Sequence, residues 1–281
     1  MNWIKDKIKK VLIGIGVIGI VSAGGIIEYD LSHITGLEMA DKLNNASQEI
    51  RAEYVLEGAS FKATPKNDPK DRIEVKVGGK DEFKPKIEIQ RWDNEVNFSV
   101  ELKETETGNP TLNFEGEKIK WSKGNIDVEY YPYEGGHKMV WFLKEKPATN
   151  KVEFTLQSKG LDFFYQPPLT QEFQNGYSEE FKEEIVVTET DVKDLEGNTL
   201  VHRPENVVGS YAVYHNGNPT NYVGGKLYRT GKVGHIYRPR LYDSNGWEVW
   251  GDLFIDAEQG IYRITIDQTF LDTAKYPIKC E

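Results

Sequence analysis

Strict alternation of apolar and polar residues over short segments is the feature that most constrains how this chain folds. It recurs over residues 73–77, 96–102, 126–130 and 152–156. Successive side chains of a β-strand point to opposite faces, so a period of two predicts strands with one buried face and one solvated face. Turn residues separate these segments at the short intervals typical of antiparallel sandwiches. We expect the charged outer faces to be ordinary solvated surface.

The alternation predicts an all-β protein made of two antiparallel, jelly-roll-like β-sandwich units. We place the first unit over residues 53–159 and the second over residues 160–281. Inside the second unit, residues 169–205 are polar and weakly patterned, and we expect a long excursion there with a hairpin at Glu196-Gly197-Asn198. Asp243-Ser244-Asn245-Gly246 predicts another hairpin, because Asn-Gly readily takes the positive φ that such a turn requires.

The N-terminal segment predicts export. Several lysines within the first ten residues precede residues 11–27, which carry no charge. A basic start followed by an apolar helix is typical of a signal peptide, here with a cleavage site before Gly24, or of a membrane anchor retained through residues 11–27. We assign residues 1–27 to this segment and residues 28–52 to a helical lead-in, where small apolar residues recur at helical spacing. The lysines place the remainder of the chain outside the cytoplasm.

Composition excludes several classes of function. The net charge of −10 argues against nucleic acid as a partner, since such binders carry a basic surface. A single cysteine, Cys280, provides neither a disulfide framework nor a cysteine-rich metal site. The histidines lack a metal-ligand spacing, no nucleophile elbow occurs, and the many carboxylates single out no catalytic pair. We therefore predict no catalytic residues, no metal, no cofactor and no enzymatic activity, with a glycoside hydrolase kept as an alternative.

Aromatic residues suggest a second alternative, a carbohydrate-binding or lectin-like surface module. Adjacent aromatic residues of a strand point to opposite faces, so some of them are expected to meet solvent, where a ring can stack on a sugar. The candidate glycan-binding residues are Tyr130, Tyr131, Tyr133, Trp247 and Trp250.

The C-terminal half resembles a β-rich module of large secreted bacterial proteins. The succession over residues 232–246, 261–267 and 270–278 is similar to a block of wall-associated and YD-repeat (Rhs-like) proteins, and Val208 to Tyr214 is similar to phage-like surface sequences. The resemblance covers about residues 150–279. It implies an extracellular or virion-exposed scaffold and carries over no functional residue. The family pattern continues with Asp-Pro where this chain has Lys279-Cys280-Glu281, which leaves open whether the chain is complete or a fragment.

Together these observations predict a non-enzymatic structural or adhesive scaffold, displayed on a cell envelope or a particle. We expect a final edge strand at Tyr276, Pro277 and Ile278, where a copy of the chain or another surface protein adds a strand. The alternatives are the glycan-binding module and the glycoside hydrolase.

Overall fold

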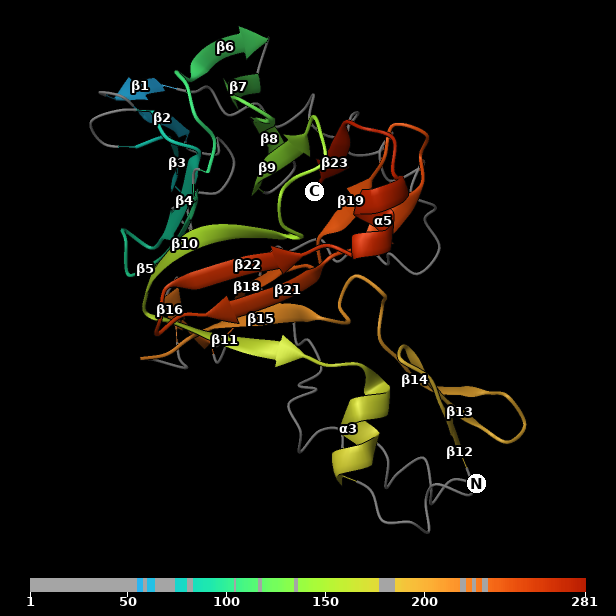
Figure 1. Ribbon diagram of the computed structural model, residues 1–281. Coiled ribbons are helices and arrows are strands. Elements are labelled where there is room, and N and C mark those ends of the chain that lie inside the picture. The colour runs from blue at the N-terminus through green and yellow to red at the C-terminus, as the bar shows by residue number, and fades with distance from the viewer. Residues whose placement is uncertain are drawn as a thin grey trace. The chain divides into compact units, whose positions relative to one another are not determined.

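The computed structural model describes residues 55–57, 60–63, 74–79, 83–103, 105–115, 118–133, 136–176, 185–217, 221–223, 226–228 and 232–281. These residues are mostly β, in antiparallel sheets with two short helices, so the predicted all-β class is confirmed (Figure 1). The expected signal or anchor at 1–27 and the lead-in at 28–52 lie outside the described residues. Within the described part, no helix has the length and apolar character needed to cross a membrane.

The chain divides into two compact units, which we describe separately. Of the described residues, those between 55 and 166 and between 209 and 281 form the larger unit, and those between 167 and 208 form the smaller. Sheet A of the larger unit runs in the order β1 (Val55–Glu57), β2 (Ser60–Ala63), β3 (Glu74–Val77), β4 (Lys86–Arg91), β5 (Val96–Leu102), β10 (Lys151–Lys159), β22 (Ile261–Thr265) and β21 (Asp252–Asp256).

Sheet B of the larger unit has seven strands. Its order is β20 (Glu248–Trp250), β19 (Arg240–Tyr242), β23 (Ile278–Cys280), β9 (Gly136–Leu143), β8 (Ile126–Tyr133), β7 (Lys118–Lys123) and β6 (Thr111–Glu115). Sheet C has the order β11 (Leu161–Gln166), β15 (Ser210–His215) and β18 (Lys232–Ile236), and β16 (Asn221–Val223) pairs with β17 (Lys226–Tyr228). Helix α5 (Gln268–Thr273) begins at Asp267, whose side chain accepts a hydrogen bond from Phe270 N.

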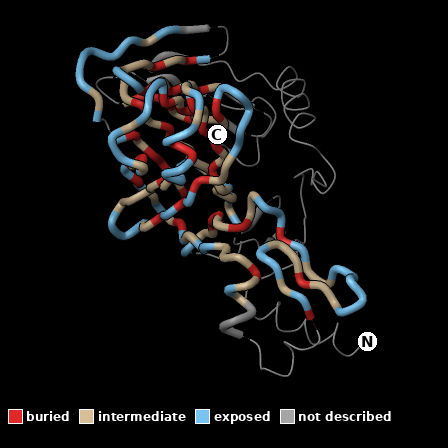
Figure 2. Tube along the Cα trace, turned by 45° about the vertical axis from the view of Figure 1, so that its right-hand side comes forward, coloured by how far each residue is buried: buried red, intermediate tan, exposed pale blue. Residues whose placement is uncertain are grey.

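One hydrophobic core lies between sheets A and B (Figure 2). Alternate residues of both sheets enter it, as the burial of Val152, Phe154 and Leu156 along β10 illustrates. Trp121 of β7 and Phe270 of α5 are among its largest fully buried side chains. The period of two therefore decides which face of each strand is dry.

The predicted boundary between residues 159 and 160 is wrong, because it does not separate two sandwiches. β10 precedes this boundary, yet it pairs with β22 along Lys151–Thr155. β9 precedes it too, and pairs with β23. Both large sheets thus combine strands from the two halves of the sequence. Alternation reveals the faces of a strand but not its neighbours, so this topology could not be read from the pattern.

Sheet C also faces sheet A. The chain leaves β10 through Gly160, whose φ of +70° suits glycine and whose Cβ, if present, would lie 3.0 Å from Glu95 O. Phe163 and Ile236 of sheet C pack against the main core, and Tyr211 is part of it. The Tyr211 hydroxyl accepts a hydrogen bond of 3.1 Å from Ile255 N of β21. Sheet C thereby satisfies a main-chain donor on one edge of sheet A.

The smaller unit contains α3 (Leu169–Gly176), β12 (Ile185–Val187), β13 (Asp191–Asp194) and β14 (Thr199–His202), with the strands paired in that order. Its own core is built on Leu169, Ile185 and Val192. The expected excursion over 169–205 falls within this unit, and the expected hairpin joins β13 to β14. A buried Arg203 pairs with Glu172 of α3 at 3.0 Å, linking the helix to the end of the sheet.

The prediction of an edge strand at Tyr276, Pro277 and Ile278 is wrong. β23 has a neighbour on each side, β19 and β9, so its main chain has no open edge for a partner. Ile278 is fully buried in the core, and the Tyr276 hydroxyl donates to Leu271 O. Pro277 is exposed but precedes the strand.

Candidate binding face on the seven-stranded sheet

The outer face of sheet B, which we call the B face, is defined by the residues that alternate with the core residues. On β8, Ile126, Val128 and Tyr130 point into the core, so Asp127 and Glu129 project from the other side. Tyr130 is fully buried and is therefore unavailable to a glycan, contrary to its place among the predicted residues.

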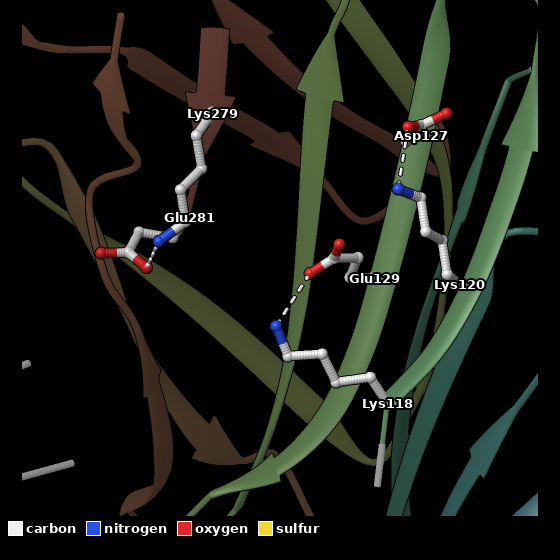
Figure 3. Close-up of polar contacts among 6 residues, drawn as sticks. All are labelled: Lys118, Lys120, Asp127, Glu129, Lys279 and Glu281. Carbon is white, nitrogen blue, oxygen red and sulfur yellow. Dashed lines mark hydrogen bonds and ion pairs between the residues drawn. The ribbon is translucent and has the colours of Figure 1, made fainter. Parts of the chain in front are cut away.

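Ion pairs join β7, β8 and the end of β9 across the B face. Lys118 Nζ lies 3.4 Å from Glu129 Oε2, and Lys120 Nζ lies 3.3 Å from Asp127 Oδ2 (Figure 3). Lys144 Nζ lies 2.7 Å from Asp127 Oδ1. Each carboxylate thus holds at least one ammonium group in place, as expected for opposite charges facing each other across strands.

The same pattern continues on the far side of the sheet. Glu281 Oε2 lies 2.8 Å from Lys279 Nζ (Figure 3). It also lies 3.5 Å from Lys138 Nζ. Arg240 of β19 pairs with Glu248 of β20. Among the side chains described on the B face, the cations outnumber the carboxylates.

The carboxylates that pair with lysines lie deeper than their partners, whereas Glu248 is more exposed than its partner Arg240. The Glu129 side chain is 14% exposed, whereas its partner Lys118 is 48% exposed. Val140 projects from the same face, since it pairs with Glu129, and it is only 1% exposed although it belongs to none of the hydrophobic core clusters. Neighbouring side chains therefore cover Val140, and the lysine side chains of this part of the B face are more exposed than the carboxylates with which they pair.

The carboxylates Asp127 and Glu281 stay ionised at neutral pH. Burial by itself raises the pKa of Asp127, but hydrogen bonds from Lys144 and Ser122 outweigh it, so the pKa lies below its usual value. Burial acts in the same direction on Glu281, where the hydrogen bond from Lys279 and the charge of Lys138 again outweigh it and lower the pKa.

Tyr131, one of the predicted glycan-binding residues, lies on the B face, half-buried beside Lys118. Lys118 Nζ is 5.4 Å from the centre of its ring, within the range of a cation–π contact. Burial, with smaller contributions from Glu281 and Glu129, raises the pKa of Tyr131 to about 12. The phenol therefore keeps its proton at physiological pH and can donate a hydrogen bond.

Trp250, another predicted residue, lies at the opposite margin of the B face. Arg240 and Arg238 place their guanidinium carbons 5.1 and 5.7 Å from the centre of its ring. Arg240 and Lys279 also approach the Tyr242 ring, at 5.5 and 5.8 Å. The aromatic side chains of this face therefore support cations, which leaves less of each ring open to a sugar than we expected.

The remaining predicted residues are not brought to this face. Trp247 is exposed, but its ring packs edge-on against Phe270 of α5 at 4.9 Å and so lies on the other side of the hairpin. The side chain of Tyr133 lies outside the described residues. Sequence analysis missed the cations Arg240 and Lys279. The alternation of Arg238, Arg240 and Tyr242 places these three residues on one face, whereas Lys279 joins that face only through the pairing of β23 with β19.

The cations described on the B face can hold an anionic ligand. In the described part of the chain, no group of three or more histidine, cysteine or acidic side chains could hold a metal ion. Comparison with protein-family models, curated proteins and solved structures finds no match for this chain. The resemblance to wall-associated modules stays a prediction.

Proposed function

We propose that this chain is a non-enzymatic adhesive module of an envelope surface, and that it binds an acidic polysaccharide across the B face. The observation that supports this most directly is a sheet face on which the described cations outnumber the carboxylates, on a chain whose net charge is −10. Elsewhere the chain repels an anionic polymer, so binding is confined to a place where the local charge is reversed.

The B face has the extent that an extended polymer needs. Glu129, Val140, Glu281, Arg240 and Trp250 follow one another across five neighbouring strands. Since neighbouring strands lie about 4.8 Å apart, this row measures roughly 19 Å. Cations flank the row on both sides, so a polymer lying along it would meet ammonium or guanidinium groups at repeated intervals.

Aromatic side chains contribute by fixing the cations and by donating hydrogen bonds. A guanidinium group held over an indole ring has less conformational freedom to lose when it binds a carboxylate. The Tyr131 phenol, which remains protonated, can donate to a sugar hydroxyl or to a carboxylate. The expected export agrees with this role, because envelope polysaccharides lie outside the cytoplasm.

The proposal is tested by titrating the full chain with polygalacturonate and with neutral dextran, using isothermal titration calorimetry at low salt. We expect binding to polygalacturonate alone, and weaker binding as salt is added. The double variant Arg240→Gln, Lys279→Gln should weaken binding about tenfold, or about 1.4 kcal/mol, because it removes two exposed charges.

Two further variants act as controls. Glu248→Gln removes an exposed carboxylate from the B face and should strengthen binding, whereas Trp247→Ala removes a ring from the other side and should leave it unchanged. Equal affinity for dextran, or no response to the double variant, would contradict the proposal.

A further inference from the structure

β11 is the longest edge strand among the described strands, and it is poorly protected. It has six residues, and its only strand neighbour in the described part of the chain is β15. Phe164 is 51% exposed and Tyr165 is 46% exposed. We propose that a second copy of this chain pairs with β11 in the antiparallel direction, which joins two copies through a continuous sheet. This inference does not depend on the proposed function of the B face.

Hydrogen bonds to β15 identify which main-chain groups of β11 are open. Gly160 O accepts from Asn216 N at 3.0 Å, and Gln166 O accepts from Gly209 N at 2.7 Å. Because main-chain groups alternate in direction along a strand, residues with even numbers turn toward β15. Leu161, Phe163 and Tyr165 therefore direct their N–H and C=O groups to the open edge.

Little in the described structure competes for this edge. The side chain of Gln166 approaches it, since its Nε2 lies 3.4 Å from Tyr165 O. Gln166 Nε2 also lies 3.1 Å from Phe164 O. Both of these contacts involve carbonyl oxygens, so the N–H groups of Leu161, Phe163 and Tyr165 can still donate to a partner strand.

Three other edge strands of the larger unit, β21, β20 and β18, are protected in ways that β11 is not. On β21, the N–H of Ile255 donates to the Tyr211 hydroxyl, and Asp252 and Asp256 place charge at both ends of the strand. β20 is only three residues long. The pairing of β18 with β15 shifts register at its far end, between Val213 and Tyr214. Short strands, charges and irregular pairing are the usual protections of an edge.

A second copy fits β11 because the strand complements itself. With the two-fold axis at Phe163, Leu161 of one copy lies opposite Tyr165 of the other, and all three open residues find partners. Asp162, the one charged residue of the strand, then lies opposite Phe164 of the second copy, so no like charges face each other. The same patch serves both copies, and the assembly closes as a dimer.

The first test changes the main chain at the open edge. Tyr165→Pro removes an N–H that points away from β15, and its ring is compatible with an edge strand. We expect the full chain to form a dimer with increasing concentration in sedimentation equilibrium. Tyr165→Pro should raise the dissociation constant of the dimer about tenfold or more. Tyr165→Thr keeps the N–H and should raise the dissociation constant less.

The second test examines the register at Phe164, which is half exposed and whose ring contacts Tyr214, a contact that the Glu and Lys variants lose equally. Phe164→Glu would oppose Asp162 of the second copy and should weaken the dimer, whereas Phe164→Lys would face that carboxylate and should preserve it. Combining Phe164→Glu with Asp162→Lys should restore the dimer. A wild-type chain that stays monomeric, or a dimer that responds equally to Glu and Lys at position 164, would overturn the proposal.

Discussion

At the scale of single residues, His235 links the stability of the larger unit to pH. Its Nε2 lies 2.7 Å from the buried Ser210 Oγ, and burial together with the nearby Lys232 lowers the pKa of His235 to about 4. An unfolded histidine has a pKa of about 6.5, so the unfolded chain binds more protons between these values. Stability should be complete above pH 6.5 and fall as the pH decreases to 4. After allowance for solvent screening we expect a loss of about 1–2 kcal/mol, measured by urea unfolding at pH 7.5 and 4.5.

His235→Asn provides the control for this prediction. Carboxylates with lowered pKa values, among them Asp127 and Asp243, lose their stabilising charge as the pH falls further, through their own folded pKa values. The variant still loses the stabilisation that these carboxylates provide. The difference between the two plots of unfolding free energy against pH therefore gives the contribution of His235. Parallel profiles for the wild type and His235→Asn would show that His235 makes no such contribution.

At the scale of elements, Gly251 allows the chain to pass from sheet B to sheet A between β20 and β21. A Cβ at this position would lie 3.0 Å from both Ile264 Cγ2 and Leu241 Cδ1, so these side chains would have to move by a few tenths of an ångström to admit it. Gly251→Ala should reduce the free energy of unfolding by about 1–3 kcal/mol through overpacking, as measured by urea denaturation. Gly234→Ala on β18 is the matched control, because no described atom lies within 4 Å of its added methyl group. Equal stability of the two variants would contradict the prediction.

At the scale of the whole molecule, the larger unit should fold without the smaller one. Gln166 pairs with Ser210, so the chain already returns to the neighbouring strand across the insertion. Replacing residues 167–209 by Asn-Gly would join β11 to β15 through a two-residue hairpin, a turn that this dipeptide favours. We expect a cooperative thermal transition and a circular dichroism spectrum typical of β-sheet. In contrast, residues 53–159 alone should not fold, because they lack β21 and β22 of sheet A and three strands of sheet B. A folded fragment, or loss of folding in the Asn-Gly variant, would refute this description.

The candidate site was only partly predictable from the sequence. Tyr131 and Trp250 belonged to the predicted glycan-binding set and lie on the B face, but Tyr130 of the same set is core and Trp247 lies on the other side of its hairpin. Adjacent residues of a strand always face opposite ways, and choosing between them requires knowing which side carries the second sheet. Arg240 and Lys279 lie together on the B face because β19 and β23 pair with each other, although the two strands are far apart in the sequence.

The sequence by itself determined the local features of this protein. The period of two predicted strands in which alternate residues share a face, and the Asp243–Gly246 turn followed from the conformational freedom of Asn-Gly. Only the tertiary structure decided which strands are neighbours. It placed β23 inside sheet B, left β11 at an edge, and joined β10 to β22. The physical reason is that alternation depends on residues adjacent in the chain, whereas strand pairing depends on contacts between residues far apart in it.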